Sequence, residues 1–176
     1  LVQSRALLGL LSPAVTVEVH LANGLPSFTL VGLADVEVKE ARERVRSALQ
    51  NSGFEFPNNQ RITVNLAPAD LPKDSGRFDL PIALGILAAS GQIPKKTLAQ
   101  YEIAGELALT GELRPIRGAL AMAVGIAKNH ENKSHPQRTF ILPKSSATEA
   151  ALVNKVSILG ASSLLEVCTH LSGQTQ

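Results

Sequence analysis

The sequence predicts an α/β (α+β) domain, and two patterns carry that prediction. Apolar and polar residues alternate near the start of the chain, as on a half-buried strand. Further along, strand-like segments alternate with segments whose apolar residues recur at helical spacing. The composition fits a globular protein, because 44% of the 176 residues are hydrophobic and 18% are charged. Since only 3% are aromatic, we expect an aliphatic core.

The first elements are predicted to form a β-hairpin. Residues 13–22 alternate strictly between apolar and polar side chains. Asn23-Gly24 then favours a tight turn, which predicts residues 27–33 as the paired strand. Residues 4–10 are a candidate third strand.

A helix is predicted next, from residue 36 to about residue 51. Asp35 is a favourable N-cap, and Ser52-Gly53 is a typical helix end. Residues 61–67 follow as another strand. The apolar residues at helical spacing are expected to form the buried stripe: Val38, Ala41, Val45, Ala48 and Leu49.

A second helix is predicted from residue 80 to residue 90. Asp79 is expected to be its N-cap, Pro81 is tolerated in the first turn, and Gly91 ends it. Because its side chains are apolar on nearly every face, this helix should be buried. The polar loop before it, LPKDSGRF, raises the question of whether Ser75 or Asp79 carries out chemistry there.

The remaining elements alternate between strands and helices. Residues 101–116 are interpreted as two strands joined at Thr110-Gly111, and a helix follows from about residue 118 to residue 129. Residues 130–137 are a polar loop. The last elements are predicted as a strand at 139–143, a helix at 145–153, a strand at 155–161 and a helix at 162–171.

The net charge is only +2, but its distribution is uneven. Residues 114–155 contain seven Lys or Arg against two Glu. This region is either a solvated basic surface or a face for nucleic acid or an acidic partner, and the sequence leaves both alternatives open.

The common cofactor motifs are absent from the sequence. No Gly is followed by Lys, which excludes a Walker A loop, and there is no GxGxxG, HExxH or CxxC. Cys168 and His170, two residues apart, are a weak indication of metal binding, and ordinary packing on a terminal helix explains them better. We therefore predict no metal site. The lone cysteine favours a reducing compartment, and no apolar run is long enough to span a bilayer. We therefore expect a cytoplasmic protein without a membrane partner.

Three long stretches resemble one protein family. They are VEVHLANGLPSFTLVGLADVEVKEARERVRSALQNSG (17–53), NLAPADLPKDSGRFDLPIALGILAAS (65–90) and IAGELALTGELRPIRGALAMAVGIA (103–127). Together they look like the N-terminal domain of the ComM/YifB family, the magnesium-chelatase-related AAA+ proteins. The resemblance implies a ribosomal-protein-S5-domain-2-like fold, as in the proteolytic domain of Lon and the C-terminal domain of RadA.

The resemblance also implies a larger parent protein. Residues 1–172 would be one Lon-like domain, and residues 173–176 would begin a linker to an AAA+ module. That module would bind ATP and Mg²⁺ through a P-loop, whereas no cofactor is expected for the present chain. The family is similar to hexameric DNA motors, so DNA and a homo-hexamer are the partners implied for the parent. The ComM branch is associated with branch migration in natural transformation and recombination.

The resemblance to Lon raises the question of peptidase chemistry. Lon-type proteases use a Ser nucleophile and a Lys base, but the matching positions here hold Asp79 and Leu120, so no catalytic residue is predicted. Ser75 could be a displaced nucleophile beside Lys73, yet neighbours on a flexible loop are not held in hydrogen-bond geometry. The sequence therefore favours a helix start that Asp79 caps, with Lys73 and Arg77 exposed in the loop.

Basic residues are the candidates for DNA or subunit contact. Lys39, Arg42 and Arg46 form a stripe at helical spacing that would suit phosphates. The alternative is a solvent face made of salt bridges between residues four apart. The pairs at that spacing are Lys39–Glu43 and Glu40–Arg44.

Two further pairs of cations lie in loops. Lys73 and Arg77 flank the loop before the buried helix, and Arg114 and Arg117 lie at the end of the predicted hairpin. Each pair could face a channel or a neighbouring subunit, or only solvent. Since there is no Trp and one Tyr, we expect DNA contacts to the backbone rather than to stacked bases.

Three functions compete. The leading hypothesis is a non-catalytic domain of a ComM-type AAA+ DNA motor that supports oligomerisation, DNA engagement or both, in a parent that is an ATPase. The second is a divergent Lon-like peptidase, which needs a Ser-Lys pair. The third is a chaperone-like module, as in magnesium-chelatase relatives.

Overall fold

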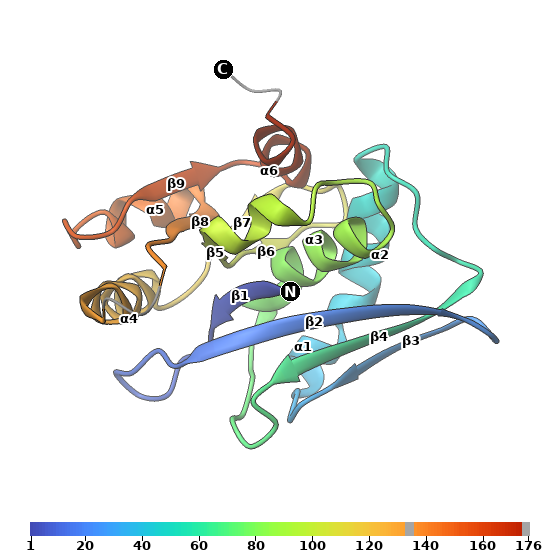
Figure 1. Cartoon of the computed structure of the whole chain (residues 1–176), viewed down its shortest axis with the longest axis horizontal. Helices are drawn as coiled ribbons and strands as arrows, with labels where there is room; N and C mark the ends of the chain where they lie inside the picture. Colours follow the sequence, from blue (N-terminus) through green and yellow to red (C-terminus); the bar gives the residue numbers. More distant parts are fainter. Residues whose placement is uncertain (133–135, 174–176) are drawn as a thin grey trace.

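Seven strands form one mixed sheet in the order β3-β4-β2-β1-β5-β8-β9, which confirms the α/β class (Figure 1). The computed structural model describes residues 1–132 and 136–173. The strands are β1 (Val2–Arg5), β2 (Ala14–Asn23), β3 (Ser27–Val31), β4 (Gln60–Ala67), β5 (Tyr101–Ile103), β6 (Glu106–Leu107), β7 (Leu113–Arg114), β8 (Thr139–Pro143) and β9 (Ile158–Ala161). The helices are α1 (Val36–Lys39), α2 (Ala41–Asn51), α3 (Asp79–Ala89), α4 (Ala119–Glu131), α5 (Lys144–Ala150) and α6 (Leu164–Leu171), with 3₁₀ turns η1 (Gly76–Phe78) and η2 (Lys96–Gln100).

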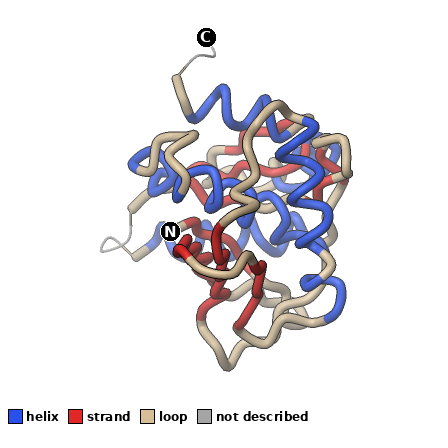
Figure 2. Tube along the Cα trace, turned by 90° about the vertical axis from the view of Figure 1, so that its right-hand side faces the viewer, coloured by secondary structure: helices blue, strands red, loops and turns tan. Residues whose placement is uncertain are grey.

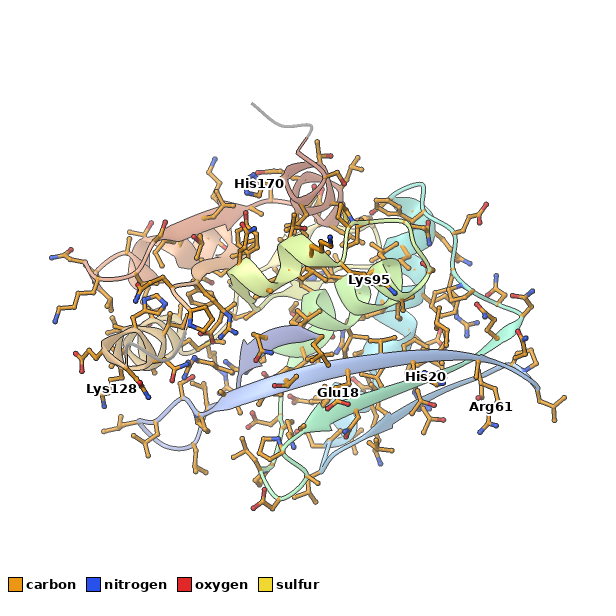
Figure 3. The ribbon with its side chains drawn as sticks, in the orientation of Figure 1. Glu18, His20, Arg61, Lys95, Lys128 and His170 are labelled. Atoms are coloured by element: carbon orange, nitrogen blue, oxygen red, sulfur yellow. The ribbon has the colours of Figure 1, made fainter. Side chains whose placement is uncertain are left out.

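Strand β2 shows the predicted alternation of faces. Val15 and Val17 are buried beneath the helices, whereas Glu18 and His20 are exposed on the opposite face of the sheet (Figure 3). Helices α2 and α3 lie on one side of β2, β3 and β4 (Figures 1 and 2). Because the helices cover only one face of the sheet, apolar and polar residues alternate along β2, and this alternation predicted the strand.

The predicted hairpin between the second and third strands is wrong. Strand β4 lies between β2 and β3, pairing antiparallel with β2 from Asn23↔Gln60 to Thr16↔Ala67 and parallel with β3. Every second residue of β4 is buried, which suits a central strand, whereas only Leu30 of β3 is buried, which suits an edge. The local turn signal therefore gave the direction of β3 but not its partner.

The first predicted helix is divided at Glu40 into α1 and α2. Its start is as expected, because the Asp35 Oδ1 accepts a hydrogen bond of 2.8 Å from the Val38 amide. All five residues of the predicted stripe are buried, and the helix ends at Ser52 before Gly53, whose φ is +86°.

Helix α3 is buried on nearly every face, as predicted, and it packs against β1, β2 and α2. The close approach to β2 requires Gly85. A Cβ atom at that position would lie 2.5 Å from the Val19 Cγ2 atom. The central helix is therefore fitted to the sheet through a residue without a side chain.

The predicted pair of strands at 101–116 is only partly correct. The turn is confirmed, since Gly111 has a φ of +95° and joins the small two-stranded sheet of β6 and β7. Tyr101–Ile103 instead forms β5 of the main sheet, paired with β1 and β8. The later strands and helices occur in the predicted order: β8 has the predicted bounds, α4 extends to Glu131, and α5, β9 and α6 are shorter than predicted. Residues 133–135 of the predicted loop and residues 174–176 of the predicted linker lie outside the described residues.

The apolar side chains form two clusters. The larger one surrounds α3, and the smaller one lies between α4, α5 and β8. Within residues 1–132 and 136–173, no helix combines the length and apolar character needed to cross a membrane.

Candidate functional site

Asp79, at the position that matches the Lon nucleophile, is a buried ion-pair partner and not a helix cap. Its side chain is 0% exposed and accepts hydrogen bonds from Arg44 Nε at 2.7 Å, Arg44 Nη2 at 3.1 Å and the Leu107 amide at 3.0 Å. The residue belongs to the first turn of α3, and its carboxylate turns away from that turn's amides. The predicted capping role is therefore wrong: Asp79 joins α2, α3 and β6.

The electrostatics of this pair follow from its burial. Desolvation raises the pKa of Asp79 to about 6, against the lowering effect of the hydrogen bonds from Arg44. The hydrogen bond to Asp79 raises the pKa of Arg44. At neutral pH the carboxylate is ionised and its oxygens are occupied by Arg44 and Leu107, so it has no free position for a substrate.

Leu120 lies where the Lon lysine would be. It is 38% exposed in the first turn of α4, and its amide donates to Glu149 Oε1 at 3.3 Å. An exposed aliphatic side chain supplies neither a base nor a proton donor. The two positions that the resemblance matches to the Lon Ser and Lys thus hold a salt-bridged carboxylate and a leucine.

Ser75 and Lys73 are not arranged as a nucleophile and its base. The Ser75 hydroxyl accepts a hydrogen bond from Arg77 Nε at 3.1 Å, whereas Lys73 Nζ donates to the carbonyls of Gly32, at 2.7 Å, and Pro68. The ammonium is thus committed to backbone oxygens, and desolvation lowers its pKa.

The prediction that Lys73 and Arg77 are exposed is wrong. Each is 1% exposed. The hydrogen bond from Lys73 Nζ to the Gly32 carbonyl connects the loop to the segment after β3. Arg77 Nη1 donates to the Arg117 carbonyl at 2.9 Å. Because charged loop residues usually remain in water, only the tertiary contacts could reveal these two buried cations.

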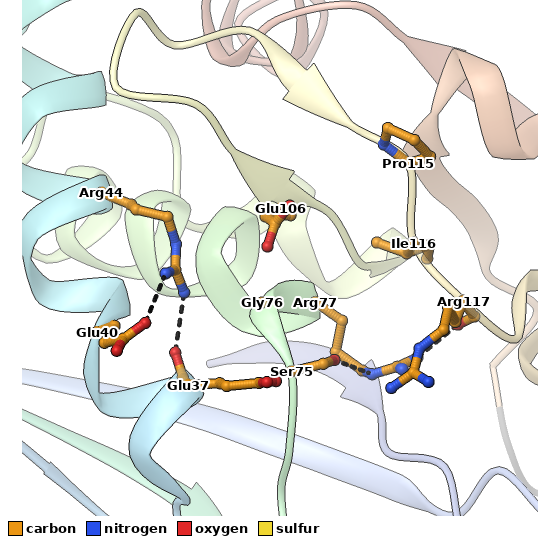
Figure 4. A pocket seen from close by; sticks show the side chains of 10 residues that line it. All are labelled: Glu37, Glu40, Arg44, Ser75, Gly76, Arg77, Glu106, Pro115, Ile116 and Arg117. Atoms are coloured by element: carbon orange, nitrogen blue, oxygen red, sulfur yellow. Dashed lines mark hydrogen bonds and ion pairs between the residues drawn. The ribbon is translucent and has the colours of Figure 1, made fainter.

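A pocket of about 540 Å³ opens above this loop. Figure 4 shows Glu37 and Glu40 on one side and Arg77 and Arg117 on the other, with Ser75 between them. The remaining lining residues are Arg44, Gly76, Glu106, Pro115 and Ile116. Arg77 and Arg117 of this pocket were predicted from the sequence as candidate contact residues. Glu37 and Glu106 were not, because no local pattern connects them to the loop.

The stripe of Lys39, Arg42 and Arg46 is exposed, and it lines a neighbouring groove together with Phe28, Val36, Glu40 and Glu43. Arg42 donates to the Lys39 carbonyl at 3.1 Å and to the Phe28 carbonyl at 3.3 Å. The Arg46 guanidinium lies 4.9 Å from the centre of the Phe56 ring. These contacts position the Arg42 and Arg46 guanidinium groups beside the groove.

The alternative of a salt-bridged helix face is only half realised. Glu40 and Arg44 approach to 3.7 Å, as predicted. Within the described residues, no ion pair joins Lys39 to Glu43. Arg114 is exposed but is not part of either lining, so the structure brings Arg77 and Arg117 together and leaves Arg114 apart.

The candidate metal pair has other roles. His170 Nε2 lies 3.1 Å from the Tyr101 hydroxyl, and Cys168 is buried, which raises the pKa of its thiol to about 12. Among the residues with described positions, no three His, Cys, Asp or Glu side chains gather as metal ligands would.

Comparisons with known proteins agree on one family. The sequence model of the family described as "Subunit ChlI of Mg-chelatase" matches residues 17–146. Competence protein ComM of Haemophilus influenzae is 52% identical over 174 residues, and YifB of Escherichia coli is 49% identical over the same length. A protein of Mycobacterium tuberculosis, Rv2897c, is 34% identical over 172 residues. The alignments cover 98–99% of this chain but only 33% of each relative, so the chain spans about a third of their length.

Proposed function

The chain belongs to the magnesium-chelatase-related ComM/YifB family, and we propose that it acts as the non-catalytic N-terminal domain of a ComM-type AAA+ DNA motor. The rest of such a parent would hold ATP and Mg²⁺ and drive branch migration in transformation and recombination. The present domain would engage DNA, neighbouring subunits of a homo-hexamer, or both, in the cytoplasm.

The observation that carries the non-catalytic part of this proposal is the pairing of Asp79 with Arg44. A reactive residue needs an unoccupied face toward substrate. The Asp79 carboxylate is fully buried and accepts three hydrogen bonds. The position therefore contributes to stability, in the place where a Lon-type protease has its nucleophile.

The exposed stripe on α1 and α2 supports DNA engagement. Lys39, Arg42 and Arg46 outnumber the two carboxylates of their groove, Glu40 and Glu43, and none of the three cations forms an ion pair with a described carboxylate. Three phosphate contacts to a single strand would give a slope of about −2 in log affinity against log salt. Affinity would then fall about 20-fold between roughly 50 and 200 mM salt.

The test is fluorescence anisotropy of the chain with labelled single-stranded and forked DNA at low salt. The variant Arg42→Glu/Arg46→Glu should lose binding, because two phosphate contacts become repulsive. The matched control is Lys95→Glu/Lys96→Glu, which makes the same charge change at two exposed positions outside the groove (Figure 3 labels Lys95). Equal loss in both variants would show a nonspecific charge effect, and no binding by the wild-type chain would leave subunit contact as the function.

The match to the ChlI model favours a chaperone-like module as a second candidate. A titration with Mg²⁺ and a porphyrin that showed a saturable site would support it. The peptidase alternative requires activity that Ser75→Ala abolishes, and the contacts of Ser75 and Lys73 give it no support.

A further inference from the structure

The buried Arg77 lacks an acidic partner. Its acceptors are the Ser75 hydroxyl, the Arg117 carbonyl and the Met122 sulfur, and no carboxylate in the described part of the chain forms an ion pair with it. Arg5, also buried, pairs with Glu102 at 2.7 Å. Buried cations are ordinarily compensated in this way. Arg77 is thus a buried guanidinium with no carboxylate at ion-pair distance among the described residues, and Asp74 acts on it only from farther away.

Arg117 adds a second positive charge at the same place. Its carbonyl accepts from Arg77, its side chain is exposed, and both residues lie at one end of the pocket (Figure 4). Burial lowers the pKa of Arg77, the Asp74 charge opposes that shift, and repulsion from the Arg117 charge lowers the pKa further. An anionic group bound between them would relieve that repulsion.

The opposite end of the pocket is acidic. Glu37 lies at that end with Glu40, and Glu106 lies between the two ends (Figure 4). Neither Glu37 nor Glu106 has an ion-pair partner among the described residues, although the Glu106 charge acts on Arg44, which pairs with Asp79 and Glu40. Glu106 lies directly over the loop, since a Cβ atom at Gly76 would be 2.4 Å from its Oε1. A polyanion such as DNA would meet these carboxylates unfavourably, whereas a ligand with both charges would match both ends.

Ser75, between the two ends, has a strained backbone. Its φ of 65° and ψ of 178° fall in a region that glycine alone normally occupies. Such strain persists only where the surroundings impose it, and it concentrates at ligand sites. The hydrogen bond from Arg77 to the Ser75 hydroxyl holds this conformation beside the pocket.

We propose that the pocket binds a mixed-charge peptide segment, with a carboxylate placed against the exposed Arg117, above the buried Arg77, and a Lys or Arg side chain toward Glu37 and Glu106. Its volume of about 540 Å³ is suited to two or three residues. The binding is noncovalent, and the pocket adjoins the groove proposed for DNA, with which it shares Glu40. The proposal does not depend on DNA engagement, because none of the three cations of that groove lines the pocket.

The test is an amide-resolved NMR titration of the chain with acetylated, amidated tripeptides. Glu-Ala-Lys and Lys-Ala-Glu are the mixed-charge probes, Glu-Ala-Glu and Gln-Ala-Gln are the acidic and neutral ones, and a short oligothymidylate is the nucleic-acid probe. We expect saturable shifts at residues 75–77, 106 and 115–117 with at least one mixed-charge peptide. The acidic and neutral peptides should bind about 10-fold more weakly, as the loss of one favourable pair predicts.

Variants of exposed residues complete the test. Arg117→Ala and Glu37→Gln should each lower the affinity for the mixed-charge peptide about 10-fold, while Lys95→Ala should leave that affinity unchanged. The proposal would be overturned if no chemical shift saturated at about 10 mM peptide, because a dissociation constant above that concentration is too weak for a specific contact of this kind. Equal binding of the neutral peptide, unchanged binding in Arg117→Ala, or the same shifts with oligothymidylate would overturn it as well.

Discussion

Replacing Arg44 with methionine should strongly destabilise the domain. The substitution keeps most of the aliphatic volume but leaves the Asp79 carboxylate, which is 0% exposed, without its partner. Breaking a buried ion pair from one side costs about 3–5 kcal/mol. Since the Arg44 side chain is 21% exposed, we expect the lower end, about 3 kcal/mol. For a domain of this size that lowers Tm by about 6–12 °C.

The destabilisation should also depend on pH. The pKa of Asp79 is about 6 in the folded protein and 3.8 in the unfolded chain, so the unfolded chain releases this proton first. The wild type therefore loses stability as pH rises from about 4 to about 6. Without Arg44 the folded pKa rises further, which extends this loss above pH 6. The effect of Arg44→Met should be largest above pH 6 and shrink toward pH 4.

Urea denaturation followed by circular dichroism, at several pH values, measures both effects. Asp79→Asn and the double variant complete a thermodynamic cycle, in which the second substitution should recover part of the stability lost in Arg44→Met. A loss below about 1 kcal/mol that is additive with Asp79→Asn and independent of pH would refute the structural role of the pair.

Three further substitutions or reactions test other features. Gly85→Ala should destabilise by about 1 kcal/mol or more in urea unfolding because its Cβ meets Val19, and it should become neutral or stabilising in a Val19→Ala background. Ser75→Gly should be more stable than Ser75→Ala by about 1 kcal/mol in thermal unfolding, because both lose the hydrogen bond from Arg77 but only glycine relieves the positive φ; equal Tm values would argue against strain. Cys168, buried with a thiol pKa near 12, should resist a thiol reagent at neutral pH until urea unfolds the chain, as intact mass will show.

Local patterns predicted the elements that local chemistry determines. The buried stripe of the first helix, its Asp35 cap and the all-apolar helix α3 follow from spacing and composition within a few residues. The partner of β3 was mispredicted because pairing depends on which strand, β4, best fills the centre of the sheet, and that competition is not local.

The candidate site was harder to predict, because its charges are paired across the chain. Asp79 has the sequence signature of a cap, but Arg44 lies 35 residues away and competes successfully for its carboxylate. Lys73 and Arg77 have the sequence context of exposed loop cations. Both are buried, and backbone carbonyls from other segments accept their hydrogen bonds. The mismatch with a Lon-type Ser-Lys pair, by contrast, needed only the identities of residues 79 and 120.

The salt dependence of DNA binding tests the central claim most directly. Affinity for single-stranded DNA should be measured by anisotropy from roughly 50 to 200 mM salt, for the wild type, Arg42→Ala/Arg46→Ala and the control Lys95→Ala/Lys96→Ala. For the wild type and the control we predict a slope of log affinity against log salt near −2. For Arg42→Ala/Arg46→Ala, which removes two of the three phosphate contacts, we predict a slope near −0.7. A slope that is the same in all three proteins, or no measurable binding, would contradict a DNA-engaging role for the groove of Lys39, Arg42 and Arg46.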